Sequence, residues 1–482
     1  MNALEDIPIG DRSVCADCIG EDYLADLITR SGTPAMCYYC SINGQTITIE
    51  ELSEHVEQAF DQHYVRTASE PEGYEYYVQR ETGNWARSGE PVAEVIAQML
   101  VTDEAIAEDV REVLDDKTSD WDGITCGEEQ PFSDEAHYEE TTFVDHTSIS
   151  EEYRQFEAVI IEQARYFSPE TRRFLGSLFG ELEGLGTHDG RPVLVDAGPG
   201  QPISSFFRAR VFQDDMPLKR ALALPDQELG PPPPRLGRAG RLNATGVSLF
   251  YGADTAEVAL AEVRPPVGSR VVMARFELLR PARLLDIDAL KSLLVEGSLF
   301  DPEYLGRLAH SAFLDSFSRR FTQPVMPDHE TFEYIPTQAV ADYLANEVEP
   351  VLDGILYASP QSALAGKNVA LFHRSSRVEC RVTPEGMTTD VWIGHQAEDG
   401  YEIDYTVFEE VPTPIAPAAP SRPVGRLHDF TSADAPENLD TRAPTLRIDL
   451  DSVEVRHIEA VEVRNEVHEV SRSRHTRGQS SF

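Results

Sequence analysis

The sequence has few basic residues. Its 482 residues include 41 Lys and Arg against 84 Asp and Glu, a formal net charge of −43. Only four of these cations are lysines: Lys117, Lys219, Lys291 and Lys367. General affinity for nucleic acid or an anionic membrane is excluded, because both need positively charged faces. The composition favours a protein of a high-salt cytoplasm, where salt screens the self-repulsion; an acidic mesophilic protein is the alternative.

The sequence also lacks a long hydrophobic run. No segment reaches the roughly 18 apolar residues that a membrane-spanning helix needs. The first residues, Met1 to Arg12, are polar and acidic, unlike a secretion signal. We therefore expect a cytoplasmic protein with no membrane partner. Its length allows about two to four domains.

Cysteine is scarce, and four of the six cysteines form two C-x2-C motifs. Cys15 and Cys18 make the first, and Cys37 and Cys40 make the second. This spacing suits four thiolates around a tetrahedral zinc ion. Disulfides are disfavoured in the cytoplasm, and a redox pair needs a single motif beside a βαβ unit. We predict a structural zinc site, because four thiolates leave no open position for catalysis.

Helical periodicity dominates residues 46–190. Apolar residues recur at helical spacing over residues 91–116, where two helices are expected, and over 151–166 and 168–185. The acid-rich stretch 116–150 is expected to be mostly loop.

From residue 202 the pattern changes to short strands with occasional helices. The expected strands are 204–212, 247–251, 270–278, 282–287, 354–358 and 368–373, and the expected helices are 302–321 and 336–347. Strands and helices do not alternate regularly, which favours an α+β fold. The glycine-rich segment 184–200 is read as a connector between this region and the helical one.

A glycine-bracketed turn, Gly240–Gly246, precedes an expected strand that ends at Tyr251. A helix over residues 255–264 follows, and Glu262 lies on its apolar side. A carboxylate in this position is costly unless it meets a partner or a ligand. Two interpretations stay open: a pocket for an anionic, partly aromatic ligand, or a structural ion pair with Arg241 or Arg264.

Several dispersed motifs carry a resemblance to a known family. They are Phe206-Phe207-Arg208-Ala209-Arg210, Gly240-Arg241-Leu242-Asn243 with Gly246 and Tyr251, the helix with Glu262, Gly354 to Ser359, and Gly366-Lys367-Asn368 with Phe372. In this order they resemble the RES domain over roughly residues 200–375. The family is named for an Arg, a Glu and a Ser, which match Arg241, Glu262 and Ser359. Leu242 departs from the pattern, since many relatives have an aromatic residue there.

The resemblance implies a fold similar to ADP-ribosyltransferases and cleavage of the nicotinamide–ribose bond of NAD, in a toxin or defence effector that depletes NAD. The implied catalytic residues are Arg241, Tyr251, Glu262 and Ser359, and the implied NAD-binding residues are Arg208 and Asn243. In this scheme Glu262 stabilises the oxocarbenium-like ribose. Arg241 binds the pyrophosphate, Tyr251 stacks on nicotinamide, and Ser359 contacts the ribose or a phosphate.

Four regions are therefore expected: a zinc knuckle (1–45), a helical accessory domain (46–190), the RES domain (200–380), and a β appendage with a Pro/Ala linker and a tail (381–482). The accessory domain resembles the HEPN-like region ahead of some RES domains, which suggests an antitoxin or regulatory partner. It lacks the Arg-x4–6-His pair of HEPN ribonucleases. The alternatives are a mono-ADP-ribosyltransferase acting on a macromolecule and a non-catalytic zinc-containing interaction protein.

Overall fold

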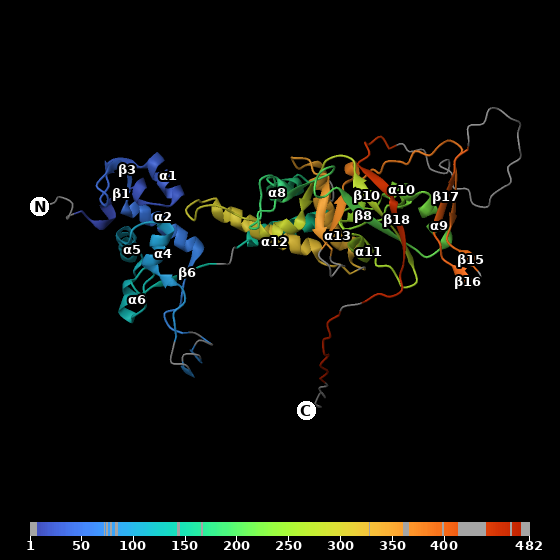
Figure 1. Cartoon of the computed structure of the whole chain (residues 1–482). Helices are drawn as coiled ribbons and strands as arrows, with labels where there is room; N and C mark the ends of the chain where they lie inside the picture. The colour runs from blue at the N-terminus through green and yellow to red at the C-terminus, as the bar shows by residue number, and fades with distance from the viewer. Residues whose placement is uncertain are drawn as a thin grey trace, which may run out of the picture. The chain divides into compact units, whose positions relative to one another are not determined.

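The computed structural model describes residues 7–71, 73, 76–77, 80–81, 85–141, 145–164, 167–326, 328–359, 366–397, 400–412, 440–462 and 465–473. The expected Pro/Ala linker beyond residue 412 and the tail beyond residue 473 lie outside these ranges. The chain divides into two compact units (Figure 1): unit 1 is Met1–Val159, Leu185–Arg191 and Ala289–Arg320, and unit 2 is Ile160–Gly184, Pro192–Asp288 and Phe321–Phe482. None of the helices in the described ranges combines the length and apolar character needed to cross a bilayer.

Unit 1 begins with a three-stranded sheet in the order β1-β3-β2, followed by helices packed around one apolar core. Its strands are β1 (Ser13–Cys15), β2 (Thr33–Met36), β3 (Asn43–Thr48), β4 (Tyr64–Arg66), β5 (Glu90–Pro91) and β6 (His137–Glu140). Its helices are η1 (Ile9–Asp11), η2 (Ala16–Cys18), α1 (Asp22–Ser31), α2 (Ile49–His63), α4 (Val92–Leu100), α5 (Glu104–Thr118), α6 (Trp121–Cys126) and α7 (Thr147–Ala158). The two helices predicted within 91–116 are confirmed as α4 and α5. The loop prediction for 116–150 is wrong in part, because α6 and β6 lie there.

Local sequence explains where the helices of unit 1 begin. Thr48 precedes α2, and its hydroxyl accepts a hydrogen bond from the backbone N–H of Glu51 over 3.2 Å. The Glu51 carboxylate accepts one from the backbone N–H of Thr48 over 2.9 Å. This reciprocal capping box satisfies two donors that a helix start leaves unpaired.

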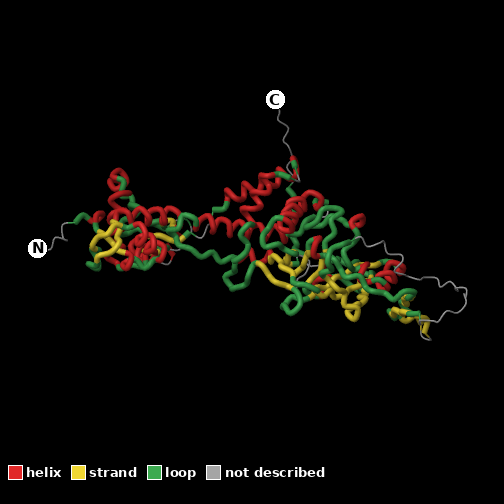
Figure 2. Tube along the Cα trace, turned by 90° about the horizontal axis from the view of Figure 1, so that it is seen from above, coloured by secondary structure: helices red, strands yellow, loops and turns green. Residues whose placement is uncertain are grey.

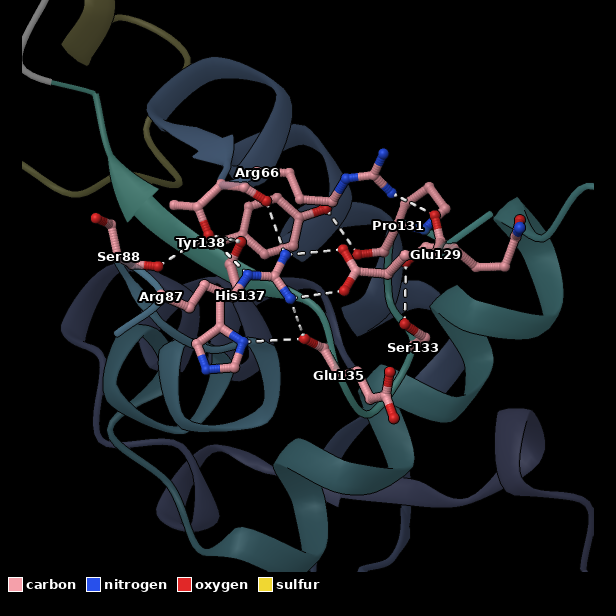
Figure 3. A network of polar contacts seen from close by, with 11 residues as sticks. Arg66, Arg87, Ser88, Glu129, Pro131, Ser133, Glu135, His137 and Tyr138 are labelled. Atoms are coloured by element: carbon pink, nitrogen blue, oxygen red, sulfur yellow. Dashed lines mark hydrogen bonds and ion pairs between the residues drawn. The ribbon is translucent and has the colours of Figure 1, made fainter. Parts of the chain in front are cut away.

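A half-buried arginine fixes the second sheet of unit 1, which has the strand order β4-β6-β5. Figure 3 shows Arg87 beside Glu129, with N–O distances of 2.6 and 2.8 Å. The same guanidinium donates to the carbonyl oxygens of Thr67 (2.7 Å) and Glu135 (2.5 Å). Charge-assisted, two-pronged contacts of this kind hold a defined geometry. Arg87 therefore ties the loop that contains Glu129 to the strands.

Unit 2 contains an eight-stranded sheet in the order β18-β10-β8-β9-β13-β12-β11-β7. Its strands are β7 (Leu194–Ala197), β8 (Ser205–Phe212), β9 (Phe250–Ala253), β10 (Arg270–Leu278), β11 (Ala282–Asp286), β12 (Gly354–Ala358), β13 (Lys367–Leu371) and β18 (Leu446–His457). β11 and β12 run parallel, and the other described neighbours run antiparallel. In Figure 2 most strands of this unit, in yellow, lie together. Two small ladders follow, β14 (Thr388–Trp392) with β17 (Thr406–Glu410), and β15 (His395–Ala397) with β16 (Gly400–Glu402).

The mixed strand and helix content bears out the α+β expectation, and most predicted elements are present. Two assignments change. The segment 184–200 is not only a connector, because β7 lies in it and pairs with β11 at the sheet edge. The helix expected from Pro336 begins earlier, at Glu330, with the proline inside it. Pro336 removes the helical bond to the carbonyl of Phe332, an exposed residue, so the interruption is tolerated.

The helices of unit 2 cover both faces of the sheet. They are α8 (Pro169–Phe179), α9 (Asp215–Ala223), α10 (Pro225–Glu228), η4 (Pro234–Leu236), α11 (Ala256–Glu262), α13 (Glu330–Asn346) and η6 (His373–Ser375). Three further described helices run across the division between the units: η3 (Val159–Gln163), η5 (Ile287–Ser292) and α12 (Tyr304–Thr322). Side chains from α9 join the core that contains Phe206 and Phe250. α11 packs on the opposite face, against Phe207 and Ala253. Successive residues of a strand point to opposite faces of the sheet. Phe206 and Phe207 on β8 therefore belong to different apolar cores, and so do Phe250 and Ala253 on β9.

The sheet is split near its centre. β8 pairs with β10 over eight positions but with β9 at one only, Phe207 opposite Ala253. Gly252 permits this close approach, since a Cβ there would lie 3.0 Å from the carbonyl oxygen of Phe207. Residues on both sides of this single pairing line the cavities described next.

Candidate active site and metal centre

The four N-terminal cysteines converge in unit 1. Their sulfur atoms all lie within 4.8 Å of one another. The Sγ–Sγ distances are 3.5 Å for Cys15 and Cys40, 3.7 Å for Cys15 and Cys18, and 3.8 Å for Cys18 and Cys37. A tetrahedral zinc ion with Zn–S bonds of about 2.3 Å would space its sulfurs by about 3.8 Å. The four thiols therefore fit a metal site of the predicted kind, and none of them is in a disulfide.

The surroundings act differently on the individual thiols of this cluster: burial raises the pKa of Cys15 and of Cys18. Burial alone would raise the pKa of Cys37, but backbone N–H groups of Cys40, Cys15 and Tyr39 lower it to about 7. The Tyr39 hydroxyl donates to Asp109 on α5 over 2.5 Å, and Arg12 donates to the same carboxylate over 2.6 and 2.8 Å. The cluster is thereby tied to the helical core of unit 1.

The second candidate site is a cavity of about 190 Å³ in unit 2, at the split between β8 and β9. Aromatic, polar and charged side chains from five elements surround it. The lining residues are Phe207, Arg208, Ala209, Tyr251, Gly252, Ala259, Glu262, Val263, Tyr357 and Asn368. A small apolar cavity with a few polar groups is typical of a ligand site.

Glu262 lies at the C-terminal end of α11. This helix begins with Thr255, whose hydroxyl accepts a hydrogen bond from the backbone N–H of Val258 over 3.3 Å. It ends at Glu262 because Arg264 adopts a left-handed conformation (φ 44°) and a proline follows. Val258 is buried as the periodicity predicts, whereas Glu262 is exposed. The prediction that this carboxylate lies among apolar side chains is therefore wrong.

Two hydrogen bonds orient the Glu262 carboxylate. Oε2 accepts one from the hydroxyl of Ser359 over 3.2 Å and one from Nδ2 of Asn368 over 3.0 Å. Among the described residues no cation lies within ion-pair distance of Glu262. The ion pair with Arg241 or Arg264 that the sequence left open is therefore not formed, and the carboxylate keeps its negative charge available to a ligand.

Asn368 and Tyr357 belong to the site although neither was a candidate from the sequence. They lie directly opposite each other on β13 and β12. Asn368 is 1% exposed, and its Oδ1 has no hydrogen-bond partner among the described residues. Tyr357 is 6% exposed, and its burial raises the pKa of its hydroxyl well above the ordinary value. A buried acceptor without a donor is costly, so Asn368 is suited to a ligand that donates a hydrogen bond.

Arg208 supplies the positive charge at the cavity. Its Nη1 donates to the backbone carbonyl of Tyr251 over 3.1 Å, and its guanidinium lies 5.1 Å from the ring centroid of Phe250. Within the described ranges it pairs with no carboxylate. Burial lowers the pKa of Arg208 to about 10, with a contribution from the nearby charge of Arg210. The group therefore stays cationic at neutral pH, and most of its N–H donors remain for a ligand.

Asn243 and Tyr251 hold each other in place. The Tyr251 hydroxyl donates to Oδ1 of Asn243 over 2.7 Å and accepts from the backbone N–H of Leu242 over 3.3 Å. Nδ2 of Asn243 donates to the carbonyl oxygens of Arg238 (2.9 Å) and Val247 (2.8 Å). The Asn243 side chain thus closes the turn and positions Tyr251; a contact between Asn243 and NAD stays a prediction. Gly240 leaves room for this arrangement, because a Cβ there would lie 2.8 Å from Oδ1 of Asn243.

Arg241 does not line the cavity. Its Nη1 donates to the carbonyl oxygen of Phe321 and its Nη2 to that of Gln323 over 2.7 Å, at the C-terminal end of α12. Its guanidinium also lies 5.3 Å from the ring centroid of Tyr334. A cation is favourable at a helix C-terminus, where carbonyl groups lack partners. Of the predicted residues, the structure therefore brings Arg208, Tyr251, Glu262 and Ser359 together, holds Asn243 behind Tyr251 in the turn, and directs Arg241 away from the cavity.

Part of the chain matches a known protein family. No curated protein and no solved structure matches this chain. Residues 217–391 match the family model of the RES domain. The matched range contains Tyr251, Glu262 and Asn368, whereas Arg208 lies before it and β18 after it. This match supports the resemblance indicated by the motifs.

Proposed function

We propose that unit 2 is an NAD glycohydrolase that cleaves the bond between nicotinamide and ribose in the cavity beside Glu262. The supporting observation is a carboxylate fixed by Ser359 and Asn368 at the edge of a cavity lined by Tyr251 and Tyr357. The match to the RES domain adds to it, since the motifs resemble a family that degrades NAD.

The reaction needs charge stabilisation more than proton transfer. The bond from the nicotinamide nitrogen to ribose C1′ breaks, and its electron pair neutralises the cationic ring. Positive charge develops on the ribose, as in other glycosyl transfers. Water then bonds to C1′ and releases a proton, which gives ADP-ribose, nicotinamide and H⁺. A fixed carboxylate stabilises the developing cation electrostatically.

Each described residue receives a role. Glu262 faces the ribose and its hydroxyls, and the tyrosine rings pack on nicotinamide. The Oδ1 atom of Asn368 accepts a hydrogen bond from the nicotinamide amide or a ribose hydroxyl. Arg208 binds the phosphate nearest the ribose. Arg241 acts as a positioning residue that anchors the turn carrying Asn243.

Unit 1 has a different proposed role. A zinc ion held by the four cysteines would supply folding energy to the knuckle. The accessory region around it would bind an antitoxin or regulatory protein, in a cytoplasmic toxin or defence effector adapted to high salt. Residues 46–190 as a HEPN-like domain are part of this proposal.

The test is NAD turnover by the purified full-length chain at several salt concentrations. Glu262→Gln should lower kcat by about 100-fold or more, as loss of a charge-stabilising group typically does. Glu257→Gln is the matched control, because Glu257 lies on the same helix, is exposed and lines neither cavity described here. Equal turnover by Glu262→Gln and the unmodified protein would refute the assignment.

Labelled NAD separates hydrolysis from transfer in the same assay. Release of free ADP-ribose supports the glycohydrolase, and label retained on protein or nucleic acid supports an ADP-ribosyltransferase. If NAD is not consumed at any salt concentration, the non-catalytic alternative holds.

A further inference from the structure

The cavity beside Glu262 is too small for a whole dinucleotide. Its volume is about 190 Å³, whereas sites for drug-sized ligands span roughly 300–1,000 Å³. A nicotinamide ring with part of its ribose suits that volume. The ADP portion of the substrate therefore needs a second compartment next to the first.

A larger cleft of about 1,170 Å³ adjoins the cavity in unit 2. Arg208 and Tyr251, the residues that flank the split between β8 and β9, line both spaces. We call the larger space the arginine cleft after the six arginines that line it: Arg208, Arg210, Arg220, Arg238, Arg377 and Arg442.

The charge of the arginine cleft is opposite to that of the protein. Three carboxylates, Asp226, Glu228 and Asp440, line it beside the six arginines. The chain as a whole carries 84 acidic residues against 41 basic ones. A local excess of arginine on so acidic a protein focuses a positive field on one cleft.

Among the described residues, arginines outnumber carboxylates in the ion pairs of the cleft. Arg210 and Arg220 both contact Glu228, with N–O distances of 2.7 and 2.8 Å. Arg377 and Arg442 likewise share a single carboxylate, Asp440, at 3.9 and 2.5 Å. In each of these two clusters, two guanidinium groups lie beside one carboxylate.

We propose that the arginine cleft binds the diphosphate of NAD, while the nicotinamide end occupies the cavity beside Glu262. This inference rests on the proposed function. The surplus guanidinium groups match a doubly charged diphosphate, and their planar N–H pairs suit phosphate oxygens. Arg208 lies where the two compartments meet and contacts the diphosphate from its ribose side.

The test uses the full-length chain with Arg220→Gln and Arg442→Gln. Arg220 has a half-exposed side chain, so its loss should leave the fold intact. Arg447→Gln is the control, because Arg447 is an exposed arginine on β18 that lines neither space. Each cleft variant should raise KM for NAD about tenfold and leave kcat within about twofold, as loss of a charged hydrogen bond predicts. Hydrolysis of nicotinamide riboside, which has no phosphate, should be unchanged.

ADP, which carries a diphosphate but no nicotinamide, serves as a second probe. It distinguishes a cleft that binds the diphosphate of NAD from a separate nucleotide site. Calorimetry should show ADP binding to the unmodified chain, about tenfold weaker in both cleft variants, and ADP should compete with NAD. ADP that binds without competing indicates a separate nucleotide site and overturns the proposal. Unchanged KM and ADP affinity in both variants, with Glu262→Gln still inactive, overturns it while the glycohydrolase stands. If no NAD is cleaved, the glycohydrolase and the NAD assignment fail together, and ADP binding shows only whether the cleft holds a diphosphate.

Discussion

Asn368 donates a hydrogen bond to Glu262 over 3.0 Å, and its own carbonyl oxygen is buried without a protein partner. One amide thus orients the carboxylate and keeps an acceptor for a ligand. The strand β13 fixes this amide, since Asn368 pairs with Ala253 on β9 and with Tyr357 on β12.

Replacing Asn368 by Asp should lower kcat for NAD about 10- to 100-fold, because the hydrogen bond to a charged group is lost and two carboxylates face each other. Steady-state kinetics at neutral pH measures the effect. Asn346→Asp, at an exposed position on α13, should keep normal kinetics. An unchanged kcat in Asn368→Asp would contradict the proposed role of this amide.

Replacing Tyr251 by Phe should destabilise unit 2 by about 1–3 kcal/mol, since Oδ1 of Asn243 and the N–H of Leu242 both lose their partner. Urea unfolding measures the change. Tyr343→Phe on α13 is the control, because the structure shows no hydrogen bond from its hydroxyl within the described residues. If Tyr251→Phe unfolds at the same urea concentration as the original protein, the turn does not depend on this contact.

These contacts show which features local sequence predicts. The helix α11 follows from its capping Thr255 and the prolines after Arg264, all within twelve residues. The contacts of Arg241 cannot be predicted from local sequence, because its partners Phe321 and Gln323 lie some eighty residues away along the chain. Asn368 appeared in a recognised motif, but no periodicity distinguishes it from a structural residue, and only the strand register places it beside Glu262.

Removing the metal should unfold the knuckle of unit 1. The purified chain should contain one zinc per molecule, and Cys37→Ser or a strong chelator should cost several kcal/mol of stability, roughly in line with other structural zinc sites. Metal analysis and thermal unfolding measure both quantities. Cys126→Ser should change neither, since Cys126 is exposed and apart from the cluster. Full stability of a metal-free chain would rule out the structural zinc.

Unit 1 should lose stability in mild acid through His63. This side chain is 4% exposed, and burial lowers its pKa below the ordinary value, against the opposing charge of Glu140. The unfolded chain then binds the proton more readily, so the stabilisation is complete above about pH 6.5 and is lost as the pH falls through the folded-state pKa. Urea unfolding between pH 8 and pH 5 should show a smaller loss for His63→Gln. Equal losses in the two proteins would exclude His63 as the cause.

The edge strand β18 has a practical consequence for expression. The family match stops at residue 391, yet residues 446–457 form the outer strand beside β10. A fragment truncated at residue 391 would expose the unpaired backbone of β10, and exposed strand edges of this kind recruit other chains. Recombinant fragments of unit 2 should therefore extend past His457, or supply β18 as a separate peptide, if they are to stay monomeric.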